Sequence, residues 1–361
     1  MLNFASLNAF LIISAINNKL LIIYIKCQVM SVKIAFFDSK PYDEASFKQC
    51  NENFRFDIHY YKGHLNSDNV MLTKGADVVC IFVNAVADAE VIEELVNNGV
   101  KLIALRCAGY NNVDLKTAKD RIKVVRVPAY SPHAVAEHTL ALMLTLNRKI
   151  HKAYSRTREG NFALNGLLGF DMFEKTAGII GTGKIAKILI RILSGIGMKI
   201  LANDLYPDEE FAKKYDVEYT SLDELYKRSD IISLHCPLTK ETEYIINTNS
   251  ISKMKDGVMI INTGRGKLIN TNALIKGLKN KKIGSAGLDV YEEESDHFFE
   301  DHSNIVMDDD VLARLLSFNN VIVTSHQAFF TKEAMKNIAE TTLQNIQDFV
   351  DGKVLVNEVV K

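Results

Sequence analysis

From Val32 onward, short apolar runs alternate with longer segments whose apolar residues recur at helical spacing. The apolar runs predict strands at 32–37, 77–83, 101–105 and 123–127, and then at 176–180, 198–203, 231–235, 258–262, 283–289 and 321–325. The helical spacing predicts helices at 88–98, 133–160 and 331–350. Strands that alternate with helices favour parallel sheets covered on both faces. The pattern therefore predicts an α/β protein with two doubly wound parallel-sheet domains.

The N-terminal segment does not follow this pattern. Residues 2–25 are apolar, but Asn17, Asn18 and Lys19 interrupt them. A secretory signal would begin with basic residues, and a membrane-spanning helix needs about 20 residues with few polar interruptions. We therefore expect residues 1–30 to be an extension outside the core, with Met30 as the natural start; a membrane-associated leader is the alternative. A chain that starts at Met30 should then keep full activity and stability.

Composition and charge narrow the classes of function. A chain of 361 residues is long enough for two domains. Lys and Arg total 43 against 44 Asp and Glu, so no basic field favours nucleic acid or an anionic membrane. The five cysteines form no Cys-x-x-Cys pair, which argues against a disulfide scaffold or a metal site and favours the cytoplasm.

A glycine-rich turn is the first candidate site. Gly181, Gly183 and Ala186 match the pattern Gly-x-Gly-x-x-Gly/Ala after an apolar strand and before an amphipathic helix. Such a turn lets the backbone approach a diphosphate at the start of the helix. Asp204 ends the next predicted strand, where an acid binds a ribose diol and repels a 2′-phosphate. The segment predicts NAD binding; the alternative is an ordinary strand–helix turn with a surface aspartate.

Three ionisable residues follow successive strands of the same region. Arg265 comes after the strand at 258–262, Glu294 lies five residues beyond Asp289, and His326 closes the strand at 321–325. The carboxyl ends of parallel strands line one edge of a sheet, so we expect these side chains to converge. A guanidinium can bind a carboxylate, and a histidine held by a neighbouring acid can transfer a proton. Each residue alone would more often simply face solvent.

These residues belong to a longer series of motifs. The others are Leu-Arg-Cys-Ala-Gly-Tyr-Asn-Asn-Val-Asp at 105–114, Val-Pro-Ala-Tyr-Ser-Pro at 127–132, Ala-Glu-His at 136–138, Ser-Leu-His-Cys-Pro-Leu-Thr at 233–239, Asn-Thr-Gly-Arg-Gly at 262–266, Gly-Leu-Asp-Val-Tyr at 287–291 and Ser-His-Gln-Ala at 325–328. Through them, residues 31–361 closely resemble the D-isomer-specific 2-hydroxyacid dehydrogenases, and within that family the branch that acts on lactate.

The resemblance implies a domain arrangement. A Rossmann NAD-binding domain over 131–327 would be inserted into a flavodoxin-like substrate domain formed by 31–130 and 328–361. The two crossovers would act as hinges. The family uses the helix that begins at His133 largely at a subunit interface, which implies a homodimer or homotetramer; burial of that helix between the two domains is the alternative.

The resemblance also implies roles for individual residues. Arg265 would orient the substrate, Glu294 would support the histidine, and His326 would be the acid/base. The implied substrate-binding residues are Ala108, Gly109, Tyr130, Arg265 and Phe329. The implied cofactor-binding residues are Gly181, Gly183, Lys184, Ile185, Asp204, Cys236, Pro237, Thr242, Thr263, Gly264, Arg265 and Asp289. No metal is implied. Gly264 departs mildly from the family, which more often has Ser or Ala there.

The implied activity is fermentative, NADH-dependent reduction of pyruvate to D-lactate. The insertion at 295–303 supports the lactate branch, because shorter-looped relatives pass from the catalytic acid to a proline-rich turn. Two alternatives stay open: a dehydrogenase for a bulkier D-2-hydroxy acid, and an NAD(H)-sensing binding protein like the corepressors that share this fold.

Overall fold

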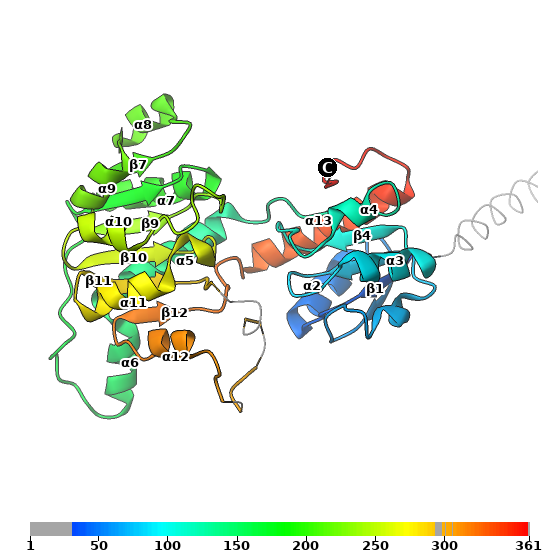
Figure 1. Ribbon diagram of the computed structural model, residues 1–361, viewed down its shortest axis with the longest axis horizontal. Helices are drawn as coiled ribbons and strands as arrows, with labels where there is room; N and C mark the ends of the chain where they lie inside the picture. Colours follow the sequence, from blue (N-terminus) through cyan, green and yellow to red (C-terminus); the bar gives the residue numbers. More distant parts are fainter. Residues whose placement is uncertain (1–30, 293–297, 300, 305, 360–361) are drawn as a thin grey trace, which may run out of the picture. The chain divides into compact units, whose positions relative to one another are not determined.

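The computed structural model describes residues 31–292, 298–299, 301–304 and 306–359, so the predicted extension and Glu294 lie outside the described residues. The chain forms two compact units (Figure 1). One unit ends at Tyr130 and resumes at Met335, and the other runs from Ser131 to Ala334. The first division falls at the predicted residue pair 130/131. The second falls at 334/335 rather than 327/328, inside the first turn of the last helix.

The first unit is built on a parallel five-stranded sheet in the order β2-β1-β3-β4-β5, the flavodoxin-like order. Its strands are β1 (Lys33–Phe36), β2 (Asp57–Tyr60), β3 (Val78–Ile81), β4 (Leu102–Leu105) and β5 (Lys123–Val125). The sequence pattern missed β2. That strand lies at the sheet edge, is only partly buried and carries polar residues, so it has no apolar run.

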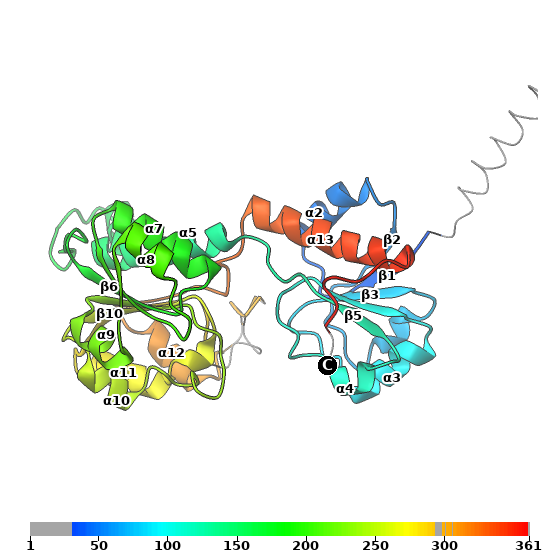
Figure 2. The same cartoon turned by 90° about the horizontal axis from the view of Figure 1, so that it is seen from above.

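Helices cover both faces of this sheet, with α2 and α13 on one side and α3 and α4 on the other (Figure 2). Their bounds are α2 (Pro41–Asn51), η1 (Val70–Thr73), α3 (Ala89–Asn97), α4 (Leu115–Ala118) and α13 (Lys332–Val350). Between them β3 and β4 are buried along their whole length. Strands enclosed on both faces read as continuous apolar runs, which is why the sequence predicted these two readily.

The second unit contains a parallel seven-stranded sheet in the order β12-β11-β10-β9-β6-β7-β8, the doubly wound order of a Rossmann fold. Its strands are β6 (Thr176–Ile180), β7 (Lys199–Asn203), β8 (Val217–Tyr219), β9 (Ile231–Leu234), β10 (Val258–Asn262), β11 (Ile283–Leu288) and β12 (Val321–Val323). The sequence pattern missed β8, a three-residue strand at the sheet edge.

In this unit α5 and α7 cover one face of the sheet, and α9 to α12 cover the other (Figure 2). The helices are α5 (Pro132–Arg148), α6 (Ile150–Arg158), α7 (Lys184–Gly195), α8 (Glu209–Tyr215), α9 (Leu222–Arg228), α10 (Thr248–Lys253), η2 (Gly266–Leu268), α11 (Thr271–Lys279) and α12 (Asp310–Leu316). Each face has its own apolar core, one around Leu189 and Leu193 of α7 and the other around Leu274 and Leu278 of α11.

The single helix predicted over 133–160 is wrong, because the chain breaks at Lys149. This residue has a φ of 50°, in the left-handed region, and separates α5 from α6. No glycine or proline marks the break in the sequence. The chain that returns after α6 supports it instead: the Asn147 amide bonds the backbone N and O of Phe170, each at 2.8 Å.

Several strands end one or more residues before the predicted carboxyl end, and four strands begin one residue after the predicted start. Just beyond three of the strands, a backbone N–H donates to a carbonyl of the neighbouring strand. The pairs are His235 to Ile180 at 2.7 Å, Asp289 to Asn262 at 2.9 Å and Thr324 to Leu288 at 2.9 Å. These residues still pair with the neighbouring strand but leave the regular ladder. Their loops are where the candidate site residues lie.

Gly178 in β6 offers a test of how tightly the second unit is packed. A Cβ at this position would lie 2.7 Å from Leu225 Cδ2 and still nearer to Ser229. We expect Gly178→Ala to destabilise the protein by about 1–3 kcal/mol, the usual effect of overpacking. Gly195→Ala is the matched control, because nothing lies within 4 Å of a Cβ there and the residue ends α7. That change should stabilise by about 0.5–1 kcal/mol. Thermal unfolding of both variants measures the difference, and equal melting temperatures would contradict it.

Candidate active site

The glycine turn lies where the order of the seven-stranded sheet reverses. Neighbouring strands β6 and β9 lead away from each other at this point, and ligands of such sheets bind beside it. Gly181 follows β6 with a φ of 88°, and a Cβ on it would lie 2.5 Å from the Cys236 nitrogen after β9. Glycine is therefore required both for the backbone conformation and for the close approach of the two loops.

The start of α7 is open to an anion. Gly183 is its N-cap and supplies no side-chain cap, and the first turn contains no acidic residue. A Cβ on Gly183 would meet nothing within 4 Å. Lys184 in the first turn pairs with no acidic side chain in the described part of the chain. Free backbone N–H groups and the helix dipole favour a negative group here, so Gly183, Lys184 and Ile185 fit a diphosphate.

Asp204 directly follows β7 and lies against the turn. Its Oδ2 accepts hydrogen bonds from the Thr182 N at 2.5 Å and the Thr182 hydroxyl at 2.9 Å, and its Oδ1 accepts from the Tyr206 N at 2.9 Å. Burial disfavours the charged form, but these hydrogen bonds outweigh it and lower the pKa of Asp204 below its usual value. The carboxylate is ionised at pH 7, which suits a ribose diol and opposes a 2′-phosphate.

The loop after β9 closes on itself through Thr242. The Thr242 hydroxyl donates to the Pro237 carbonyl at 2.6 Å and accepts from the Thr239 N at 2.8 Å. Burial raises the pKa of Cys236 to about 11, so its thiol stays protonated. Burial lowers the pKa of His235 to about 4, so its ring is neutral at pH 7. His235 and Cys236 therefore add no charge to the cofactor site, and Thr242 holds the loop in shape through its hydrogen bonds.

The loop after β10 presents Arg265. The Asn262 side chain holds this loop: its amide donates to the Arg265 carbonyl at 2.9 Å and its oxygen accepts from the Gly264 N at 3.0 Å. The Arg265 side chain is exposed, and its guanidinium donates to the Gly264 carbonyl at 2.8 Å. An arginine whose backbone is held in place and whose guanidinium is exposed can bind a planar carboxylate.

The loop after β12 carries His326 in a strained conformation. His326 has a φ of 49°, in the left-handed region. Its backbone N donates to the Asp289 carbonyl at 2.8 Å. The fully buried Asp289 carboxylate accepts hydrogen bonds from the backbone N of Gln327 and of Ala328, each at 2.9 Å, and from the Thr324 hydroxyl at 2.5 Å. Asp289, predicted to contact the cofactor, thus organises the loop of the predicted acid/base.

Two residues of α5 that the sequence analysis did not select reach these loops. His138 Nε2 lies 3.2 Å from the Thr324 hydroxyl and 3.4 Å from Asp289 Oδ1. The next residue, Thr139, is buried and shares a hydrogen bond of 2.9 Å with the Thr263 hydroxyl. Only the Ala-Glu-His motif signalled this part of α5, and the motif gave His138 no role.

The remaining predicted residues of this unit are Glu294 and Phe329. Glu294 lies outside the described residues, so its support of His326 stays a prediction. Phe329 is partly buried three residues after His326, and its ring meets that of Phe330 edge-on at 6.0 Å.

In the first unit, Ala108 and Gly109 lie in the loop after β4. Arg126 donates to the Ala108 carbonyl at 2.8 Å, and the Cys107 thiol donates to the Gly109 carbonyl at 3.3 Å. The carbonyl oxygens of Ala108 and Gly109 are therefore already hydrogen-bonded within the first unit. The Tyr130 carbonyl accepts from the Asn337 amide of α13 at 2.7 Å.

Arg106, just before that loop, is the centre of a buried charged cluster that the sequence did not reveal. Its guanidinium lies 4.7 Å from the ring centres of both Phe36 and Phe82. It donates to the Asp38 carbonyl at 2.5 Å and lies 3.4 Å from the Asp43 carboxylate. Burial raises the pKa of Asp43, although Arg106 opposes the shift. The cluster fixes the backbone immediately before Ala108.

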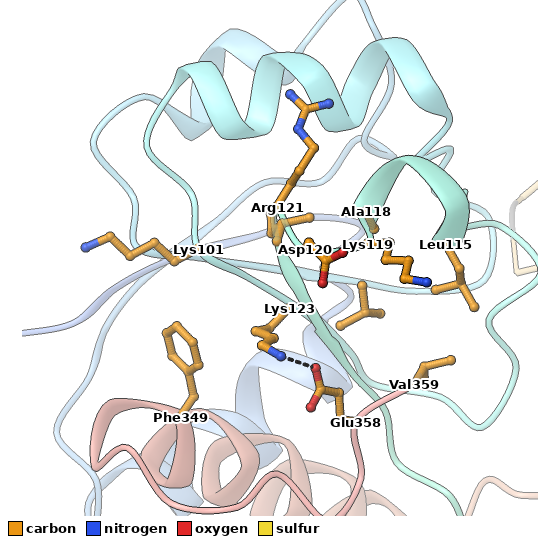
Figure 3. A pocket seen from close by; sticks show the side chains of 12 residues that line it. Lys101, Leu115, Ala118, Lys119, Asp120, Arg121, Lys123, Phe349, Glu358 and Val359 are labelled. Atoms are coloured by element: carbon orange, nitrogen blue, oxygen red, sulfur yellow. Dashed lines mark hydrogen bonds and ion pairs between the residues drawn. The ribbon is translucent and has the colours of Figure 1, made fainter. Parts of the chain in front are cut away.

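A cavity of about 500 Å³ lies elsewhere on the first unit (Figure 3). Apolar side chains such as Phe349 line it together with four basic ones, and the Lys123 ammonium is paired with Glu358 at 2.7 Å. The basic residues are Lys101, Lys119, Arg121 and Lys123. None of the predicted site residues lines this cavity, so we assign the candidate active site from the strand-end loops.

No group of three His, Cys, Asp or Glu side chains within the described residues could hold a metal ion. No helix among them is long and apolar enough to span a membrane.

Comparison with known proteins gives consistent matches. Residues 140–328 match the family model described as D-isomer specific 2-hydroxyacid dehydrogenase, NAD binding domain. The chain is 52% identical to a D-lactate dehydrogenase of Escherichia coli over 330 residues, which cover 91% of this chain and 100% of the relative. The pyruvate reductase of Chlamydomonas reinhardtii has a TM-score of 0.87 at 44% identity, covering 91% and 99% of the two chains. The D-lactate dehydrogenase from Lactobacillus jensenii, solved with NAD⁺, has a TM-score of 0.78 at 33% identity, covering 91% and 100%.

The geometry around Asp204 predicts the cofactor preference. We expect NADH to be used far more efficiently than NADPH, and Asp204→Ala to narrow the ratio of the two kcat/KM values by about tenfold or more, equivalent to roughly 1.4 kcal/mol. Because Asp204 also bonds Thr182, the KM for NADH should rise. Asp256→Ala is the control, since Asp256 is an exposed acid that pairs with Lys282 before β10, at the edge of the sheet opposite the turn. Equal use of both cofactors by the unaltered protein would refute the assignment.

Proposed function

The chain belongs to the D-isomer-specific 2-hydroxyacid dehydrogenases, NAD-dependent oxidoreductases, and we propose that its reaction is the reduction of pyruvate to D-lactate by NADH. The observation that carries the proposal is the match along 91% of the chain to relatives named D-lactate dehydrogenase and pyruvate reductase. The arrangement of Arg265 and His326 on strand-end loops of one sheet supports it. The predicted insertion at 295–303 points to the same branch.

In the proposed reaction, Arg265 binds the pyruvate carboxylate and stabilises the charge that develops on the keto oxygen. Ala108 and Gly109 are proposed to contribute backbone amides to the same carboxylate. This is consistent with their carbonyl groups being already bonded within the first unit. Tyr130 and Phe329 are proposed to limit the size of the substrate.

NADH, when bound, supplies the hydride that the keto carbon receives. Gly181, Gly183, Lys184, Ile185 and Asp204 would hold its diphosphate and adenosine ribose. The other proposed contacts come from Cys236, Pro237, Thr242, Thr263, Gly264 and Asp289. His326 in its protonated form donates the proton that completes the alcohol, so pyruvate, NADH and one proton become D-lactate and NAD⁺.

A panel of 2-keto acids tests the substrate. Purified protein should oxidise NADH with pyruvate at a higher kcat/KM than with 2-keto acids of four to six carbons, and the product should be the D isomer. A higher kcat/KM for a longer acid would show that the substrate is a bulkier 2-keto acid and not pyruvate. Binding of NADH without turnover of any acid would favour the NAD(H)-sensing alternative and overturn the enzymatic proposal.

The proton donor can be tested by pH. Because the reaction consumes a proton held on His326, kcat/KM for pyruvate should fall as pH rises. A carboxylate near an imidazole favours its charged form, so Glu294→Gln should move this fall to lower pH. His326→Gln should lower kcat by about 10²–10⁴, the usual contribution of a positioned acid, with NADH binding retained. A fully active His326→Gln variant would refute the mechanism, and an unchanged profile in Glu294→Gln would refute the pairing.

We further infer that the protein is a cytoplasmic homo-oligomer. The described cysteines are all free, as expected in a reducing compartment. Several large apolar side chains on α6 and in the returning segment 161–173 are exposed, with Leu164 at 80% and Leu168 at 87%. The others are Ile150, Tyr154, Phe162 and Phe173. Exposed apolar surface of this extent is typical of an interface. It adjoins α5, the helix that the family resemblance placed at a subunit interface.

The oligomer predicts the effect of charge on this segment. The double variant Leu164→Glu and Leu168→Glu should shift the mass measured by light scattering toward that of the monomer, because two buried charges would oppose assembly. Val354→Glu is the control: Val354 is 84% exposed but lies in the first unit, far along the chain. A monomeric unaltered protein, or an unchanged mass in the double variant, would contradict this interface.

A further inference from the structure

We propose that His138 is a positioning residue that holds the loop of the proton donor, acting on His326 through Thr324 and Asp289. The inference rests on the proposed role of His326 in the reaction. It assigns a role to the Ala-Glu-His motif, which neither the NAD site nor the substrate contacts use. All the residues involved lie in the second unit.

The direction of each hydrogen bond follows from the number of protons available. The Thr324 hydroxyl has one proton, and Asp289 Oδ1 at 2.5 Å is an acceptor that must receive it. At the 3.2 Å contact between His138 and Thr324, the hydroxyl oxygen therefore accepts, and His138 Nε2 must be the donor. A directed chain results, from the imidazole N–H through the hydroxyl to the buried carboxylate.

The carboxylate at the end of this chain determines the path of the loop. Asp289 has no exposed surface, and its two oxygens accept from the consecutive backbone N–H groups of Gln327 and Ala328. These are the two residues after His326, whose φ of 49° needs support from its surroundings. The orientation of the His326 ring therefore depends on where the Asp289 carboxylate is held.

His138 supports this carboxylate through Thr324, since its Nε2 proton goes to the Thr324 hydroxyl, which in turn donates to Asp289. The His138 Nε2 lies 3.4 Å from Asp289 Oδ1, and its side chain is only 19% exposed, so water cannot easily replace it. Removing His138 leaves the Thr324 oxygen without its donor, and a polar group that loses a partner without regaining solvent is costly. The loop can relieve that cost by moving, and His326 moves with it.

The adjacent residue shows that α5 is a common support for both loops. The Thr139 hydroxyl gives its proton to the Val135 carbonyl at 2.7 Å, so at the 2.9 Å contact the Thr263 hydroxyl is the donor. One turn of α5 thus contacts the loop of Arg265 through Thr139 and the loop of His326 through His138. This arrangement places the two loops relative to one rigid helix.

Three variants of the full-length protein separate this role from simple stabilisation. His138→Leu removes the donor, and His138→Gln returns an N–H at a similar distance along the side chain. His133→Leu is the matched control, since His133 is an exposed histidine near the start of the same helix. For each variant we would measure kcat and KM with the best 2-keto acid, the Kd for NADH by fluorescence, and hydrogen exchange of the peptide that contains Gln327 and Ala328.

We expect His138→Leu to lower kcat by about tenfold to hundredfold, as small displacements of a catalytic group do, while NADH binding is retained. Exchange at Gln327 and Ala328 should become faster, and exchange in β6 should not change. His138→Gln should restore most of kcat and of the protection, and His133→Leu should resemble the unaltered protein.

Unchanged kcat and exchange in His138→Leu would overturn the proposal. So would loss of NADH binding and faster exchange throughout the second unit, because these would show general destabilisation. The exchange comparison needs no substrate. If the unaltered protein reduces no 2-keto acid, the proposed function fails, but the exchange data still decide whether His138 holds the loop.

Discussion

A carboxylate without access to water must be surrounded by hydrogen-bond donors, and this requirement at Asp289 organises the candidate active site. Its oxygens accept two consecutive backbone N–H groups and a hydroxyl, and an imidazole lies 3.4 Å away. Meeting the requirement fixes the loop after β12 in one conformation, including the left-handed φ of His326. The hydrogen bonds to Asp289 thus offset the backbone strain at His326, the proposed proton donor. The reactive residue is placed by a polar network rather than by apolar packing around its own side chain.

The sequence predicts the parts of the fold that have a strong periodic signal. Buried strands such as β4 and β10 appear as apolar runs, and the glycine turn has a pattern fixed by the geometry of Gly181. The edge strands β2 and β8 were missed because polar residues interrupt them, whereas β5 and β12 are edge strands at least as short that carry apolar runs. The break at Lys149 depends on Asn147 bonding a residue 23 positions later, and no local pattern can contain that contact.

The site divides in the same way. Arg265 and His326 could be selected because ionisable residues directly follow apolar strands. His138 and Arg106 could not be given roles, because their partners are remote in sequence: His138 contacts Thr324, 186 positions away, and Arg106 contacts Asp38, 68 positions away. Asp289 was predicted from the sequence to contact the cofactor. In the folded chain both of its oxygens accept hydrogen bonds from the protein itself. Supporting residues are defined by contacts between distant segments, and only the folded chain shows them.

The split of the first unit along the chain has a consequence for biosynthesis. The second unit is one continuous stretch from Ser131 to Ala334, so all of its strands have been made before the last helix emerges from the ribosome. The first unit lacks α13 until the segment after Ala334 has been made. Asn345 of that helix bonds the Arg126 carbonyl at 3.0 Å, and Val359 after it bonds the Val124 carbonyl at 2.8 Å. The N-terminal sheet must therefore wait with the part of one face that α13 covers still exposed while the later unit folds, and transiently exposed apolar surface favours aggregation.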